Sequence, residues 1–102
     1  MGSGLIKQAI EKYCGAEVVP EFRFHPSRRF RIDYAIPSHR IAIEIEGGAW
    51  IGGRHTRGRG FIGDMEKYNL LTEYGWRLLR YQPGKIDYSQ IARVVDSTQK
   101  CE

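Results

Sequence analysis

The stretch "FRIDYAIPSHRIAIEIEGG" (Phe30–Gly48) has two halves in which isoleucine or tyrosine alternates with polar or small residues, and "PSHR" separates them. A period of two is typical of strands with one buried face, and proline and serine favour a turn. We therefore predict a β-hairpin at the centre of the fold. With Ser38 and His39 as its turn, three apolar pairs share the buried face: Ile36 with Ile41, Tyr34 with Ile43, and Ile32 with Ile45.

The same pairing collects charged residues on the other face of the hairpin. Asp33 then lies opposite Glu44, and Arg31 lies opposite Glu46. Opposed side chains have Cβ atoms about 4.5–5.5 Å apart, so two carboxylates repel each other unless a proton, an arginine or a divalent cation intervenes. Two interpretations stay open. Asp33 and Glu44 bind a cation such as Mg²⁺, or they pair with Arg31 or Arg29 in a structural network.

Five further elements surround the predicted hairpin. Apolar residues at helical spacing predict a helix over residues 4–14, which Gly15 ends, and a second helix, which Gly75 ends. Extended segments are predicted over 21–24, at a sheet edge because prolines lie nearby, and over 76–81. Asp87 and Gln90 resemble a capping box that starts a last helix. The predicted buried face of the second helix contains Phe61, Met65, Tyr68, Leu71 and Thr72. The order α-β-β-β-α-β-α over residues 1–102 indicates a single α/β domain.

A segment rich in glycine and arginine follows the hairpin. Gly47–Gly63 contains seven glycines and neither period, which predicts a long flexible loop. The net charge of the chain is +4, and Arg23–Gly60 holds eight arginines, three acids and no lysine. Arginine presents a planar fork to phosphate oxygens, so this bias suits a phosphodiester ligand. A solvated basic face is the alternative interpretation.

Other features bound the setting of the protein. The two cysteines, Cys14 and Cys101, are too few for a disulfide framework. No apolar run approaches membrane length, and no secretory signal is visible. We therefore expect a cytoplasmic protein that does not bind a membrane. The histidines at 25, 39 and 55 lack zinc-ligand spacing.

The acid pair in this element order resembles the PD-(D/E)xK nuclease superfamily, which has the restriction-endonuclease-like fold. The longer string "EIEGGAW…GRHTRGRGF…D.EKYN…GWRLLRY", with "FRFHPSRRFRIDYAIP" before it, is similar to small phage and prophage endonucleases. More distantly it resembles very-short-patch-repair endonucleases. The resemblance implies a central mixed sheet flanked by helices. It also implies a Mg²⁺- or Mn²⁺-dependent deoxyribonuclease that hydrolyses DNA phosphodiester bonds.

The resemblance also assigns metal ligands. Asp33 and Glu44 take the positions of the two family acids and would bind the metal, together with the Ile45 carbonyl. The family lysine position is occupied by Glu46, which is the one clear departure. Glu46 would assist catalysis, bind the same or a second metal, or form a salt bridge with Arg31.

The role of the family lysine then falls to another residue. Lys67 is the first candidate for handling the attacking water, and His55 is the second. The alternative for Lys67 is an ordinary surface pair with Asp64 or Glu66. The alternative for His55 is a phosphate or backbone contact. Glu11 and Glu21 are weaker candidates for an additional acid.

DNA is the expected partner. Its backbone would be held by Arg28, Arg29, Arg54, Arg57 and Arg59. A chain of this size favours structure-specific or nonspecific cutting of a phage, prophage or DNA-repair type, and a homodimer is plausible. Because the family lysine is absent, a non-catalytic DNA-binding module on the same fold remains an alternative. An accessory subunit of a larger nucleic-acid complex is another.

Overall fold

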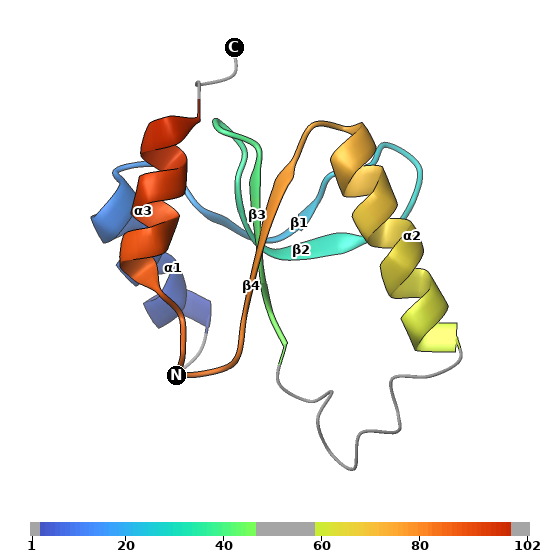
Figure 1. Cartoon of the computed structure of the whole chain (residues 1–102), viewed down its shortest axis with the longest axis horizontal. Helices are drawn as coiled ribbons and strands as arrows, with labels where there is room; N and C mark the ends of the chain where they lie inside the picture. The colour runs from blue at the N-terminus through green and yellow to red at the C-terminus, as the bar shows by residue number, and fades with distance from the viewer. Residues whose placement is uncertain (1–2, 47–58, 99–102) are drawn as a thin grey trace.

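The computed structural model describes residues 3–46 and 59–98, and these ranges form three helices and four strands (Figure 1). In chain order they are α1 (Ser3–Cys14), β1 (Val19–Arg23), β2 (Arg31–Ile36), β3 (Ile41–Ile45), α2 (Arg59–Glu73), β4 (Arg77–Tyr81) and α3 (Tyr88–Ser97). This is the predicted order of helices and strands. Gly15 follows α1 with a φ of 68°, which fits the predicted helix end.

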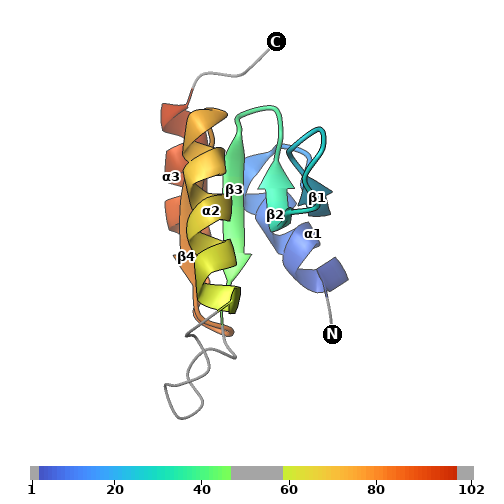
Figure 2. The ribbon, with the colours of Figure 1, turned by 90° about the vertical axis from the view of Figure 1, so that its right-hand side faces the viewer.

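The strands form one mixed sheet in the order β1-β2-β3-β4. Pairing is antiparallel from β1 to β3, and β4 runs parallel to β3. Strand β1 lies at an edge and β3 in the interior of the sheet, as predicted. Helices α1 and α3 cover one face, and α2 covers the other (Figure 1). Figure 2, turned by 90° about the vertical axis from Figure 1, shows α2 running alongside β4. The described part of the chain is thus a small α/β domain.

Each face of the sheet has its own apolar cluster. The cluster under α1 and α3 is the larger: Ile10, Val18, Tyr34, Ile36, Ile41, Ile43, Ile91 and Val95. The cluster under α2 is smaller: Phe24, Ile32, Ala35, Ala42 and Leu71. Burial on both faces explains why the small residues of the hairpin are as fully enclosed as its isoleucines. The hairpin face that the sequence predicted to be charged therefore carries charges only at one end of the hairpin and is apolar elsewhere.

The predicted hairpin register is confirmed where the two strands pair. Tyr34 pairs with Ile43 and Ile36 with Ile41, around a four-residue turn in which Arg40 has a φ of 52°. The prediction that Ile32 faces Ile45 on the same side is wrong, because Ile32 packs in the cluster under α2. Pairing of β1 with β2 skips Glu21, whose φ is 50°, and the regular alternation of faces breaks opposite this residue.

Helix α2 differs from the prediction in two ways. It begins at Arg59, so the loop predicted over Gly47–Gly63 is wrong for its last five residues. A glycine in a helix costs about 1 kcal/mol relative to alanine, although it keeps its N–H donor. Packing elsewhere along the helix outweighs that cost. Of the predicted buried face, Leu71 is buried, whereas Met65 and Thr72 are exposed.

Helix α3 begins as predicted. The Asp87 side chain caps it by accepting a hydrogen bond from the Gln90 N–H at 3.0 Å. The Gln90 side chain does not close a capping box; it accepts a hydrogen bond from the Tyr81 hydroxyl at 2.6 Å. None of the helices in the described ranges is long and apolar enough to cross a membrane.

Replacing Ile10 by alanine should lower the free energy of unfolding by about 2–5 kcal/mol, because its side chain is fully buried against the sheet. Leu5→Ala is the matched control in the same helix. Its side chain is 60% exposed, so it should cost less than about 0.5 kcal/mol. Urea denaturation followed by circular dichroism measures both values. Equal losses would contradict the packing of α1 on the sheet.

Glu11 connects α1 to the segment that follows it. Its carboxylate accepts hydrogen bonds from the Val18 N–H and from Lys7 Nζ, both at 3.0 Å. The Val18 N–H, and then Lys7, lower the pKa of Glu11 below its ordinary value of 4.5. The unfolded chain therefore binds more protons in acid than the folded chain does. Stability supplied by Glu11 is present above the unfolded pKa and is lost as the pH falls through the lowered folded pKa.

Glu11→Gln should accordingly destabilise the protein more at about pH 7 than at about pH 3, which lies below the unfolded pKa, because protonation removes the contribution of the wild-type carboxylate as the pH falls. Urea titrations of wild type and variant at the two pH values give the difference. Ile10→Ala removes no titratable group and should cost the same at both. A Glu11→Gln loss that does not shrink in acid would contradict the role of the carboxylate.

Candidate metal and phosphate site

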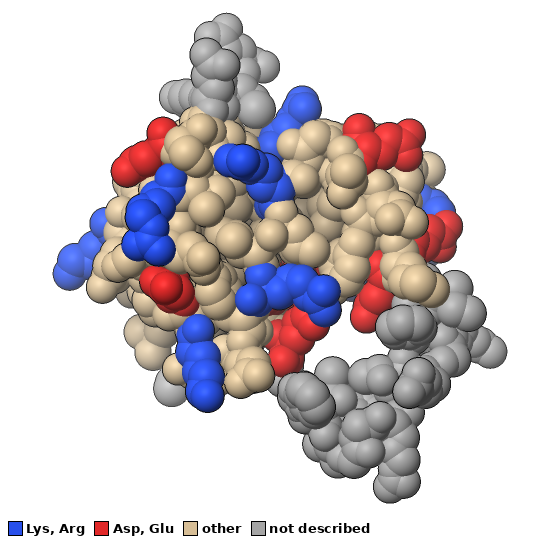
Figure 3. All heavy atoms as spheres, viewed as in Figure 1, with Lys and Arg blue, Asp and Glu red and all other residues tan. Residues whose placement is uncertain are grey.

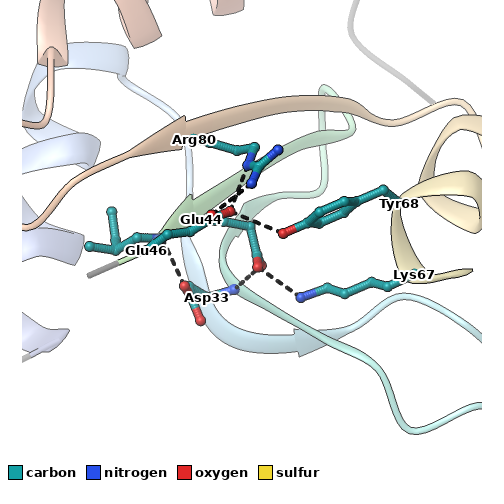
Figure 4. A network of polar contacts seen from close by, with 7 residues as sticks. Asp33, Glu44, Glu46, Lys67, Tyr68 and Arg80 are labelled. Atoms are coloured by element: carbon teal, nitrogen blue, oxygen red, sulfur yellow. Dashed lines mark hydrogen bonds and ion pairs between the residues drawn. The ribbon is translucent and has the colours of Figure 1, made fainter. Parts of the chain in front are cut away.

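The hydrogen-bond ladder between β2 and β3 gives way to side chains at the acidic end of the hairpin. Beyond the pair Tyr34 and Ile43, the Asp33 N–H donates to Glu44 Oε2 at 3.1 Å. The Ile45 N–H donates to Asp33 Oδ2 at 2.8 Å. Each strand thus supplies a carboxylate that accepts a backbone N–H of the other strand (Figure 4). These two exchanged bonds fix the two predicted family acids next to each other.

Glu44 is the one charged or polar side chain classed as buried among the described residues, with 6% of its surface exposed. Burial raises the pKa of Glu44, and the nearby Asp33 charge acts in the same direction. A hydrogen bond from Lys67 opposes the shift. The carboxylate therefore needs a positive neighbour to stay ionised.

Lys67 supplies that charge from the opposite layer. Its Nζ lies 2.9 Å from Glu44 Oε1, and the lysine side chain is only 12% exposed. Leu71, one helical turn later, is buried under α2 and fixes which side of the helix meets the sheet. Lys67 lies on that side, so its ammonium reaches the acid pair. The alternative of a surface pair with Asp64 or Glu66 is wrong, because Lys67 binds Glu44, and Glu66 binds Arg28.

Glu46 has different partners from those predicted. Arg80 donates to it twice, from Nε at 2.6 Å and from Nη2 at 2.7 Å. The Tyr68 hydroxyl donates a third bond at 3.0 Å. These contacts, the Arg80 guanidinium first, lower the pKa of Glu46. The suggested salt bridge with Arg31 is wrong, because Arg31 binds Glu21 at 2.9 Å.

Arg80 and Tyr68 are therefore site residues that the sequence did not identify. Arg80 is a charged residue within the apolar strand "WRLLRY", and it pairs with Glu44 in the parallel ladder. Its polarity was the available signal. The register of β4 against β3 could not be read from the sequence, because a long connection separates these two strands. Burial raises the pKa of Tyr68, and the hydrogen bond to Glu46 adds to that shift, so the hydroxyl stays protonated.

The predicted DNA-binding arginines are only partly placed. Arg28 lies 2.8 Å from Glu66 and stacks over Phe30, while Arg29 is exposed in the same segment. Arg59 is the first residue of α2. Arg54, Arg57 and His55, with the rest of 47–58, lie outside the described residues. On the face shown in Figure 3, positive and negative side chains are interspersed.

The other acids and histidines near the hairpin have structural partners. Glu21 binds Arg31, and Glu11 binds Lys7, so their partners differ from those of the acid pair. His25 Nδ1 accepts the backbone N–H groups of Ser27 and Arg28 in a turn. Within residues 3–46 and 59–98, no three His, Cys, Asp or Glu side chains gather as a metal site. The acids that remain are the pair Asp33 and Glu44.

Comparisons of the chain with protein-family models, with curated proteins and with solved structures find no match. Arguments about function thus depend on the geometry of the site and on the resemblance in the sequence.

Removing the Lys67 charge should destabilise the protein by about 3–5 kcal/mol, because Lys67→Met leaves Glu44 buried without its counterion. The double variant Lys67→Met/Glu44→Gln should be more stable than Lys67→Met alone, because the uncompensated charge is gone. Urea denaturation measures all three chains. Lys12→Met changes an exposed helical lysine and should cost less than about 0.5 kcal/mol. If Lys67→Met costs no more than this control, the buried pair is not what holds Glu44.

Proposed function

We propose that this chain is a metal-dependent endonuclease of the PD-(D/E)xK type that hydrolyses DNA phosphodiester bonds. The observation that carries the proposal is the acid pair Asp33 and Glu44, held by exchanged backbone bonds with Lys67 at 2.9 Å from one of its oxygens. The order of elements and the mixed sheet agree with the restriction-endonuclease-like fold that the sequence resembles.

The donor set of the site suits a hard divalent cation. Asp33 and Glu44 supply carboxylate oxygens at the point where the two strands stop pairing, and the Ile45 carbonyl adjoins them in the chain. Oxygen ligands of this kind, completed by water and phosphate, are what Mg²⁺ and Mn²⁺ accept. Bound there, the metal would polarise a phosphoryl oxygen and favour formation of hydroxide.

The charges of the site support the same cation. Asp33 and Glu44 are two negative charges, and Lys67 is one positive charge, which leaves −1 for these three residues. One divalent cation changes this to +1, which matches a single phosphodiester of charge −1. A site with a net negative charge repels DNA. This net charge explains why the same residues would bind a phosphate only together with a metal.

Lys67 takes the role of the missing family lysine. Its ammonium is held at the acid pair by α2 rather than by β3. When a cation shares the charge of Glu44, the ammonium can turn to the attacking water and to the charge that develops on the phosphate. Glu46 is bound by Arg80, so Lys67 rather than Glu46 is available for the role of the family lysine. Arg28 and Arg29 would contact neighbouring phosphates, and this requires Arg28 to leave Glu66.

The purified chain should nick supercoiled plasmid DNA when Mg²⁺ or Mn²⁺ is present, and Asp33→Asn should abolish nicking. Asparagine keeps an oxygen that can accept the Ile45 N–H, so this variant removes the charge while leaving the strand contact in place. Asp96→Asn, on an exposed position of α3, is the matched control and should cut like wild type. Agarose electrophoresis against time measures the rates.

Three results would separate the alternatives. Salt-dependent DNA binding without cutting of any substrate would favour a non-catalytic DNA-binding module on this fold. A chain that neither cuts nor binds DNA would contradict the nucleic-acid proposal and favour an accessory subunit. Cutting that survives Asp33→Asn would contradict the assignment of the site.

A further inference from the structure

The third acid of the site, Glu46, follows the acid pair closely along the chain but is held by other groups. Glu44 and Glu46 are two positions apart on β3 and its end, a spacing that directs side chains to the same side of a strand. Glu46 nevertheless accepts three hydrogen bonds, two from Arg80 and one from Tyr68. None of these donors contacts Asp33 or Glu44 by a hydrogen bond in the described part of the chain.

The contacts around Glu46 reinforce one another. Arg80 binds the carboxylate with its planar fork, which is the strongest arrangement for such a pair. The same guanidinium lies 5.0 Å from the centre of the Tyr68 ring, and the Tyr68 hydroxyl donates to the same carboxylate. Tyr68 is adjacent to Lys67 on α2, so one helix positions both the ammonium at Glu44 and the hydroxyl at Glu46.

The charge of this second group is already balanced. Glu46 and Arg80 cancel, whereas Asp33, Glu44 and Lys67 retain a charge of −1. A first divalent cation thus has an unbalanced site to occupy. A second divalent cation would bind Glu46 only if Glu46 gave up its two charge-assisted bonds and its hydroxyl contact. The Arg80 guanidinium would then be left unpaired next to the metal.

We propose that Arg80 and Tyr68 are positioning residues that keep Glu46 away from the metal, so that Asp33 and Glu44 take one divalent cation and not two. The inference rests on the proposed function, since it concerns the cation which that function requires. Phosphodiester hydrolysis is performed elsewhere with either one or two metal ions. In this chain, the two residues that bind Glu46 set the number of metal ions.

The number of bound Mn²⁺ ions tests this inference without any measurement of activity. Electron paramagnetic resonance of free Mn²⁺ in titrations of the purified chain gives the ions bound at saturation, and Asp33→Asn gives the weak surface binding to subtract. Wild type should bind one ion above that background. Arg80→Gln should bind a second ion, and the double variant Arg80→Gln/Glu46→Gln should return to one. Arg77→Gln, an arginine of the same strand that contacts Thr98 instead of Glu46, is the control and should keep one ion.

The possible outcomes distinguish this inference from the proposed function. Two ions on wild type, or one ion on Arg80→Gln shown to be folded by circular dichroism, would overturn the inference while leaving the nuclease proposal intact. Failure of wild type to bind more Mn²⁺ than Asp33→Asn would overturn both. Loss of one ion on Glu46→Gln in the wild-type background would show that Glu46 is itself a ligand, which also overturns the inference.

Discussion

Two hydrogen bonds hold the site together at the point where β2 and β3 stop pairing as strands. The backbone N–H groups of Asp33 and Ile45 would each be unsatisfied there, and the carboxylates of Glu44 and Asp33 accept them. A fully buried N–H without a partner costs about 1–3 kcal/mol, and in these part-buried positions the exchange removes a share of that cost. It also forces two negative charges into one small space.

The rest of the site follows from that crowding. Glu44 is too buried for water to solvate its charge well, so a positive neighbour is needed, and Lys67 of α2 provides it. Glu46 would add a third negative charge, and Arg80 of β4 balances it. The parallel strand β4 and helix α2 are therefore tied to the hairpin by charge as well as by the apolar cluster around Leu71. Such an arrangement is poor for stability, which accords with the proposed cation site.

The sequence predicted the hairpin well because its isoleucines leave little choice of register. A slip of one residue would move Ile41 and Ile43 from the buried cluster to the opposite face, so the alternation specifies the pairing and hence the meeting of Asp33 with Glu44. The cap at Asp87 was likewise a local signal. The resemblance implies a lysine where Glu46 stands, so it predicts a replacement, and the first candidate, Lys67, lies at the acid pair.

The failures all involve relations between distant parts of the chain. Nothing local to Ile32 shows that β1 breaks its regular pairing at Glu21 and that the start of β2 joins the cluster under α2. Arg80 meets Glu46 through the register of two parallel strands joined by α2, which periodicity does not encode. The start of α2 was hidden by glycines, whose low helix propensity tertiary packing overrides.

Diffraction from crystals soaked in Mn²⁺, recorded at the manganese absorption edge, tests the central claim most directly. The account predicts an anomalous peak within bonding distance, about 2.0–2.3 Å, of carboxylate oxygens from both Asp33 and Glu44, with Glu46 still bound to Arg80. Crystals in which Mn²⁺ binds elsewhere, and in which Glu44 contacts only Lys67 and the Asp33 N–H, would contradict it.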